Sequence, residues 1–187
     1  MGGARPRRRA GLPGTAGPGI TAPPSGTGAA SAGTAWWTLD RHVVSQPGLR
    51  TVVVALGAND IVAGAGKHQI VAQIKGLVHP TSAASLRNVR RGDRSVIHVI
   101  IATVPPLGLA ADDPREVRRK QLNETLVSEY VNLGADGVLD LAGMVADSSS
   151  NTINPDLVTG GVPNARFHDT IARAVAAAVT AFPPLEL

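Results

Sequence analysis

The chain has 187 residues, of which 43% are hydrophobic, 17% charged and 3% aromatic, which suits one domain with a core of Val, Ile, Leu and Ala. It contains no cysteine and no apolar run near the roughly 18 to 20 residues of a membrane span, which excludes disulfides, thiolate metal sites and membrane-spanning helices. Its net charge of +4 equals the contribution of Arg5, Arg7, Arg8 and Arg9, so the remainder has no excess positive charge to attract nucleic acid.

The amino-terminal segment, residues 1–34, is rich in Gly, Pro and Ala and has almost no large apolar side chain. Such a composition predicts a disordered tail, because too little surface can be buried to offset the entropy of ordering. Its arginines are not followed by the apolar stretch of a secretory signal, so we expect a cytoplasmic protein, or a secreted one if the natural chain begins further upstream. Residues 35–187 are predicted to form the folded domain.

Apolar patterns predict alternating helices and strands throughout this domain. The β-branched runs at 51–56 and 96–104 are typical of strands covered on both faces, and Pro114 marks the first turn of a helix. Because strands alternate with helices, we expect a parallel sheet between two helical layers. In chain order, the predicted elements are a helix from Ala35 to Pro47, a strand at 51–56, a loop at 57–66, a helix at 67–79, a strand at 96–104, a helix at 114–134, a strand at 138–141, a polar loop at 147–164 and a last helix that ends before Pro183.

The segment Gly57-Ala58-Asn59-Asp60 directly follows the first predicted strand. Ligands of open parallel sheets bind at the carboxyl ends of the strands. Glycine allows a ligand to approach the backbone closely, and an Asn amide supplies N–H donors for an oxyanion. The alternative is an Asn-Asp turn that caps the following helix, and the spacing alone leaves both interpretations open.

Several segments together resemble one family, the SGNH or GDSL-type hydrolases. Leu39–Ile61 is similar to the family's helix and strand that lead into a Gly-x-Asn-Asp block, here Gly57–Asp60. Pro163–Arg166 and the last helix resemble the segment that follows the family's catalytic histidine. The resemblance covers about residues 35–182. It includes a strand and a Pro-containing loop at Val99–Gly108, with Thr103-Val104-Pro105-Pro106, and a strand at Gly137–Asp140. Between them lies a helix at 118–133, with Arg118, Gln121 and Leu122-Asn123.

The resemblance implies an α/β fold, namely a three-layer flavodoxin-like α/β/α sandwich with a parallel sheet. It also implies hydrolysis of an acyl or acetyl ester of a lipid or a sugar without a cofactor, in which a serine attacks the carbonyl and a histidine, oriented by an aspartate, acts as the base. Asn59 then takes the role of an oxyanion donor, and Gly57 is the glycine of the same block. Asp60 is expected to be a structural residue of the turn.

The family's catalytic serine is not recognisable in this chain. No Gly-Asp-Ser block follows a strand upstream of Gly57, Ser31 has no strand before it, and Asp147-Ser148 lies at the wrong end of the domain. The first strand of the family's sheet is missing with the serine block. We therefore interpret the chain as truncated on its amino-terminal side and expect it to be weakly active or inactive.

The family's Asp-x-x-His-Pro block is also incomplete, since no histidine of this chain has Asp three residues before it. Gly160–Asn164 looks like this block without its histidine. His168, oriented by Asp156 or Asp169, is the candidate replacement for the base; alternatively, it is a half-exposed histidine of the last helix. The remaining histidines have no acidic partner at a suggestive spacing; they are His42, His68, His79 and His98.

Other motifs favour neither a cofactor nor a metal. Gly64-Ala65-Gly66-Lys67 lacks the further glycine and the Ser or Thr of a phosphate-binding loop, and no His and carboxylate residues have metal-ligand spacing. Arg87–Arg94 is a basic loop without aromatic residues that could stack on bases, so we predict no nucleic acid partner. The oligomeric state is left open.

Two further hypotheses stand beside the hydrolase. One is a non-catalytic module of the same fold that binds a carbohydrate, an acyl ligand or a protein partner at the carboxyl edge of the sheet. The other is association of chains through an exposed strand edge beside residues 51–56, because the strand that pairs there in the family is missing. Ligand binding without turnover would favour the first, whereas a monomer with a sharp unfolding transition would count against the second.

Overall fold

The computed structural model describes residues 43, 46, 49–79, 86, 97–149 and 151–182. The predicted tail at 1–34, with Ser31, lies outside the described residues, as does His42. Most of the helix predicted from Ala35 and the basic loop Arg87–Arg94 also lie outside them. The domain boundary at residue 35 therefore stays a prediction.

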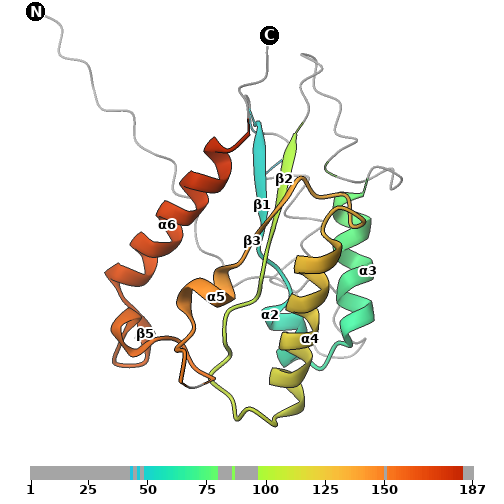
Figure 1. Ribbon diagram of the computed structural model, residues 1–187. Helices are drawn as coiled ribbons and strands as arrows, with labels where there is room; N and C mark the ends of the chain where they lie inside the picture. The colour runs from blue at the N-terminus through green and yellow to red at the C-terminus, as the bar shows by residue number, and fades with distance from the viewer. Residues whose placement is uncertain are drawn as a thin grey trace, which may run out of the picture.

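The centre of the molecule is a parallel sheet of three strands, in the order β1-β2-β3 (Figure 1). These strands are β1 Thr51–Val54, β2 His98–Ala102 and β3 Gly137–Leu139. Val53 of β1 is the register partner of Ile100, and Ile101 of β2 is the partner of Val138. The predicted parallel sheet is confirmed. Each strand ends two residues earlier than the apolar pattern indicated, so the last two residues of each predicted strand lie outside the observed one.

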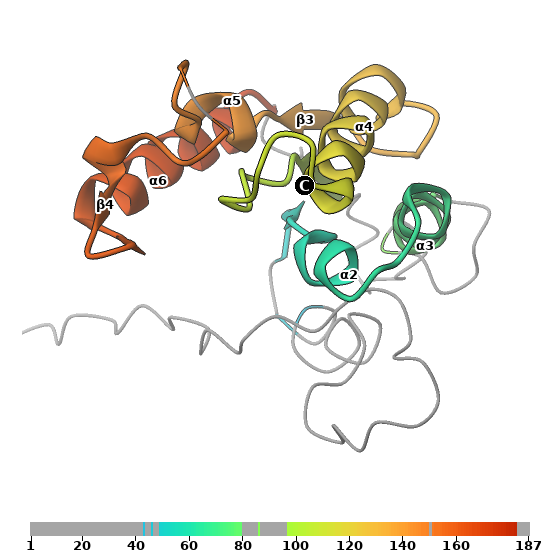
Figure 2. The same cartoon turned by 90° about the horizontal axis from the view of Figure 1, so that it is seen from below.

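Helices cover both faces of this sheet, which gives the three layers of an α/β/α sandwich compatible with a flavodoxin-like fold (Figures 1 and 2). One layer holds α2 Ala58–Val62, α3 Lys67–Val78 and α4 Pro114–Glu129. The other holds α5 Leu141–Val145 and α6 Ala165–Thr180. The predicted fold class is confirmed in this form.

Strand β2 supplies side chains to both layers, because successive residues of a strand point to opposite faces. Val99 and Ile101 belong to the core cluster shared with α2, α3 and α4. Ile100 and Ala102 belong to the smaller cluster against which α6 packs. The continuous apolar run of this strand is thus explained by burial on both sides, as the sequence predicted.

Two segments predicted as loops contain regular structure. The predicted loop at 57–66 includes the short helix α2, because Gly57, which lies three residues beyond the end of β1, adopts a positive φ of 114° and turns the chain into helical conformation. The predicted loop at 147–164 contains a 3-10 helix, η3 Pro155–Leu157, and a hairpin of β4 Val158–Thr159 and β5 Val162–Pro163. Gly160 and Gly161 join the two hairpin strands with positive φ angles of 60° and 79°, which a two-residue hairpin loop of this kind requires.

Short polar residues fix where the helices start. Pro114 occupies the first turn of α4 as predicted, and the Asp113 side chain accepts a hydrogen bond from Arg115 N. Asp140 caps α5, whose start at Leu141 corrects the prediction that β3 extends to residue 141. Asn164 caps α6 by accepting from the backbone N–H groups of Arg166 and Phe167.

Candidate functional site

The carboxyl ends of the three strands meet at one edge of the sheet, which Figure 2 views from below. Three connections leave this edge: the turn Gly57–Asp60 after β1, the loop 103–113 after β2 and Asp140 after β3. In both views the loop after β2 lies between α2 on one side and the hairpin with the start of α6 on the other. This edge is where an open parallel sheet binds its ligands, and two of the four predicted site residues, Gly57 and Asn59, lie on the first of these connections.

The turn after β1 presents Asn59 at this edge. Gly57 is buried, and a Cβ atom added to it would lie 3.1 Å from Leu122 Cδ2 and 3.5 Å from Val104 Cγ2. Glycine is therefore required here both by the positive φ and by the close packing. Asn59 is the second residue of α2 and is exposed, which the role of an oxyanion donor requires. Asp60, by contrast, is buried, with 2% of its surface exposed.

The loop after β2 is held by side chains of α4. Asn123 accepts a hydrogen bond from Val104 N through Oδ1 and donates one to Val104 O through Nδ2, each at 2.8 Å. Arg119 Nη1 donates to the same carbonyl oxygen at 3.1 Å, and its Nε donates to Glu116 Oε1 at 2.6 Å. Glu116 Oε2 accepts from Leu107 N at 3.4 Å. Three side chains of one helix thus fix this loop.

The ends of β2 and β3 are joined by a second polar contact. The Thr103 hydroxyl donates to Asp140 Oδ1 at 2.9 Å and accepts from Ala142 N at the same distance. Asp140 Oδ1 also accepts from Gly143 N at 3.1 Å, and any side chain at Gly143 would collide with this carboxylate. Because the Thr103 oxygen both donates and accepts within the fold and Thr103 is buried, these bonds give it a structural role and not that of a nucleophile.

The candidate base, His168, lies in the first turns of α6, and its candidate orienter, Asp156, lies in η3; both are exposed. Asn164 brings the two segments together, because its Nδ2 donates to Asp156 O at 3.0 Å while its Oδ1 caps α6. Within residues 151–182, however, no ion pair or hydrogen bond joins the Asp156 carboxylate to the His168 ring. Instead, the ring of His168 packs edge-on against Phe167, with 5.6 Å between the centroids.

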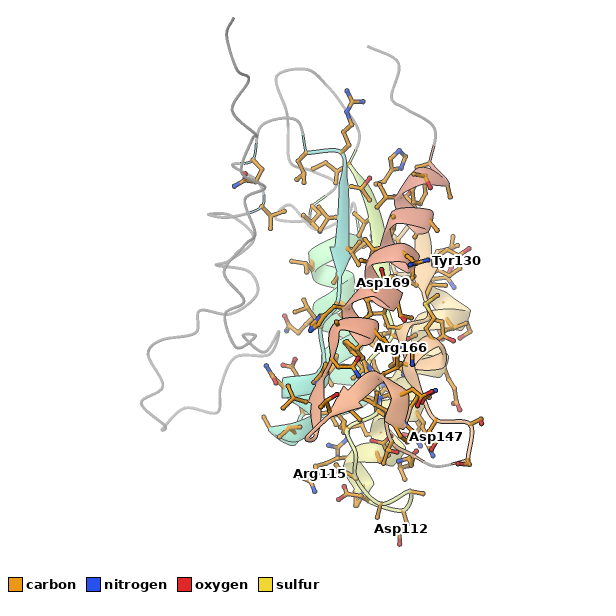
Figure 3. The ribbon with its side chains drawn as sticks, turned by 90° about the vertical axis from the view of Figure 1, so that its left-hand side faces the viewer. Asp112, Arg115, Tyr130, Asp147, Arg166 and Asp169 are labelled. Carbon is orange, nitrogen blue, oxygen red and sulfur yellow. The ribbon has the colours of Figure 1, made fainter. Side chains whose placement is uncertain are left out.

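The other candidate orienter, Asp169, is committed to a different partner. Its Oδ2 accepts a hydrogen bond from Arg173 Nε at 2.9 Å, one helical turn along α6. Figure 3 shows Asp169 on this helix, together with Arg166. Both partners of the pair are largely exposed, so the contact is that of a solvated helix surface. Neither aspartate is therefore in place to orient His168 as a base.

Sequence reasoning missed the polar group on α4. The resemblance pointed to Arg118, Gln121 and Asn123, but the arginine that holds the loop is Arg119, and Glu116 was not identified. A signal was present, because Glu116, Arg119 and Asn123 share the helix face of the buried Leu122 and Leu126 at spacings of three and four residues. Charged residues on the apolar face of a helix need partners inside the fold.

A second histidine with an acidic neighbour lies at the opposite edge of the sheet. His98 begins β2, its Nδ1 lies 3.8 Å from Asp136 Oδ2, and its ring stacks on Phe182 with 4.5 Å between the centroids. Asp136 Oδ2 also accepts from Val99 N at 2.8 Å, so this carboxylate takes part in the backbone structure where β3 starts. The separation of the two residues in the sequence gave no hint of the contact.

No protein family model matches this chain, and no curated protein matches it. The resemblance to SGNH hydrolases therefore depends on the quoted segments alone. In the described part of the chain, no three His, Asp or Glu side chains gather into a group that could hold a metal ion. None of the helices in the same part is long and apolar enough to cross a membrane.

Proposed function

We propose that this domain is a serine ester hydrolase of the SGNH type that acts on an acyl or acetyl ester of a lipid or a sugar. The observation that carries the proposal is the exposed Asn59 at the carboxyl edge of the sheet, two residues after the buried and closely packed Gly57. In this role, Asn59 Nδ2 donates a hydrogen bond to the negative oxygen that forms when an ester carbonyl is attacked, and Gly57 shapes the turn that presents it. A rigid turn favours such donors, because they need no reorganisation during the reaction.

The expected activity of this chain is low. The 187 residues contain no recognisable Gly-Asp-Ser block to supply the nucleophile, and His168 has no hydrogen bond to Asp156 in the part of α6 and η3 that is described. Loss of the nucleophile or the base removes most of the rate enhancement of a serine hydrolase even when the oxyanion donors remain. What is expected to persist is recognition of the ester carbonyl by the turn after β1.

The second candidate function is a non-catalytic module that binds an acyl ligand, a carbohydrate or a protein partner at the same edge. The pairing of Asp169 with Arg173 favours it, because it leaves His168 without that carboxylate as an orienter. A binding module needs the shape and donors of the edge but no activated nucleophile. The two candidates therefore share Asn59 and differ in whether any serine reacts.

The experiment that separates them is intact-mass analysis after treatment with a fluorophosphonate probe, run beside an assay with a short-chain p-nitrophenyl ester. A single adduct on one serine and ester turnover, both lost in Asn59→Ala, are expected of a hydrolase. Asn132→Ala is the matched control, because Asn132 is exposed beyond the carboxyl end of α4, at the opposite edge of the sheet. Saturable binding of an acyl ligand without adduct or turnover supports the binding module, and turnover that survives in Asn59→Ala rejects the role given to this residue.

A further inference from the structure

The first part of the loop after β2, residues 104–107, makes its backbone hydrogen bonds to side chains of α4. Thr103 N still donates to Leu139 O across the sheet at 3.0 Å, but the N–H and C=O groups of Val104 both bond to the side chain of Asn123, and Val104 O also accepts from Arg119. Pro105 and Pro106 have no N–H group to donate. The next donor, Leu107 N, reaches Glu116. The backbone at 104–107 therefore takes its hydrogen-bond partners from α4, and the side chains of this helix set the conformation of that part of the loop.

The side chains that hold the loop are themselves an unusual feature of the core. Glu116 is 0% exposed and Arg119 is 6% exposed. Removing an ion pair from water is costly, and loss of one partner of such a pair is strongly destabilising because it leaves an uncompensated buried charge. Here its hydrogen bonds outside the pair go to two backbone groups of the same loop, Val104 O and Leu107 N. The buried pair therefore specifies the position of this loop.

The position of the loop in turn determines the surroundings of Gly57. Val104 Cγ2 and Leu122 Cδ2 are two of the three nearest atoms to the point where a Gly57 Cβ would lie. Leu122 and Asn123 are neighbours on α4, so the residue that packs on Gly57 and the residue that holds Val104 move together. Helix α4 thus couples the turn after β1 to the loop after β2.

We propose that Asn123 and Arg119 are positioning residues for the turn Gly57–Asp60. By holding Val104 against Gly57, they fix the direction in which the first turn of α2 presents Asn59. The catalytic consequence rests on the function proposed above, whereas the coupling between Asn123 and the turn does not. Neither residue is assigned a contact with substrate.

The coupling is tested by amide hydrogen exchange, measured by NMR on the whole chain. The probe is the amide of Ile61, which donates to Gly57 O at 2.9 Å, and the reference is an amide of the central strand β2. In Asn123→Ala, exchange at Ile61 is expected to rise about tenfold relative to the reference, because the turn opens locally without global unfolding. Val175→Ala, on the opposite face of the sheet, is the matched control and is expected to leave that ratio unchanged.

A second variant keeps the test decisive if Asn123→Ala does not fold. Asn123→Asp retains an oxygen that accepts from Val104 N but loses the N–H donor to Val104 O, so it removes one of the two bonds at nearly constant shape. Its effect on Ile61 exchange is expected to be smaller than that of the alanine variant and in the same direction. An unchanged ratio in Asn123→Asp, or an equal change in Val175→Ala, overturns the proposal.

The kinetic consequence is measured separately. If the wild-type chain hydrolyses p-nitrophenyl esters, Asn123→Asp is expected to lower kcat by about tenfold with little change in KM, because oxyanion donors act mainly in the transition state. A merely structural loss would lower the amount of active protein, and titration of active sites with the fluorophosphonate probe reveals this. If Ile61 exchange responds as expected but no turnover is found in wild type, the coupling stands and the hydrolase proposal fails.

Discussion

The two faces of the sheet are built differently. Among the described residues, the face covered by α2, α3 and α4 has a cluster of fifteen buried hydrophobic residues, whereas the face covered by α6 has four. Helix α6 has no buried residue along its whole length, and its apolar side chains are only partly covered. The first face is therefore close-packed and the second leaves room for adjustment.

This difference divides the candidate site. Gly57 and Asn59 belong to the close-packed face, where α4 fixes the turn, and Asp156 and His168 belong to the half-covered face, where Asn164 connects η3 to α6. An oxyanion donor must already be in position when charge develops, so the turn lies on the face that can hold it. On the other face, a modest shift of α6 would alter the distance between Asp156 and His168.

The largest effect is expected from breaking the buried ion pair. Glu116→Ala should lower the free energy of unfolding by about 3 to 5 kcal/mol, because Arg119 is left as an uncompensated buried charge. Urea unfolding followed by circular dichroism measures this loss. The matched change on the exposed face of α6 is Asp169→Ala, which breaks the pair with Arg173 and should cost at most about 1 kcal/mol. Similar losses in the two variants would show that the Glu116–Arg119 pair contributes no more than a surface contact.

Adjacent residues of β2 provide a direct comparison of the two faces. Ile101 and Ile100 are 0% and 1% exposed and point to opposite layers. Ile101→Ala should cost about 4 kcal/mol, near the upper part of the range for such cavities, because α3 and α4 cannot move into the space. Ile100→Ala should cost about 2 to 3 kcal/mol, because the partly covered α6 can settle into the cavity. Equal losses in urea unfolding would mean that both faces are equally rigid.

The hydrogen bonds of Asn164 give a smaller effect on the half-covered face. Asn164→Ala should lower stability by about 1 kcal/mol, because α6 loses the acceptor for its first N–H groups. Asn164→Asp keeps that acceptor and loses the donor to Asp156 O, so it should retain most of the stability while freeing η3. Thermal unfolding compares the two variants, and equal losses would assign the effect to the η3 contact and not to the cap.

Local patterns in the sequence were sufficient to predict most of the fold. The runs at 51–56 and 96–104 located β1 and β2, and the apolar stripe of Ile70 and Ile74 located α3, because burial on a known face leaves a periodic trace. Pro114 located the start of α4 for a local steric reason. The short helix α2 was missed, because its five residues depend on the positive φ of Gly57 and on Ile61 reaching the core, and both are tertiary effects.

The candidate site was only partly accessible to the same reasoning. Gly57–Asp60 could be located, because it follows a strand directly and strand ends mark the ligand edge. The contact of Asn123 with Val104 joins residues 19 positions apart, and that of His98 with Asp136 joins residues 38 apart. No local pattern encodes such pairs. The relation of Asp156 to His168 likewise depends on how η3 and the hairpin fold against α6, which the sequence spacing does not determine.

The smallest effect on stability is expected at the start of α4, where Asp112 and Arg115 lie (Figure 3). Side-chain hydrogen bonds from Arg115, and then the bond from its backbone N–H, lower the pKa of Asp113 from 3.8 to about 2. Because folding lowers this pKa, the unfolded chain binds the proton first as the pH falls. The contribution of Asp113 to stability is therefore complete above about pH 4 and is lost between about pH 4 and 2.

Asp113→Asn isolates this charge, because asparagine is an equally good helix cap but cannot form the ion pair with Arg115. The difference in stability between wild type and this variant, measured by urea unfolding from neutral pH down to about pH 2, should be small and should disappear toward the acid end. A difference that stays constant with pH would assign it to the cap and not to the charge. Since Glu116 is buried within α4 and Asp113 at the start of this helix is only half-buried, the two substitutions together measure how strongly burial increases the contribution of an ion pair to stability.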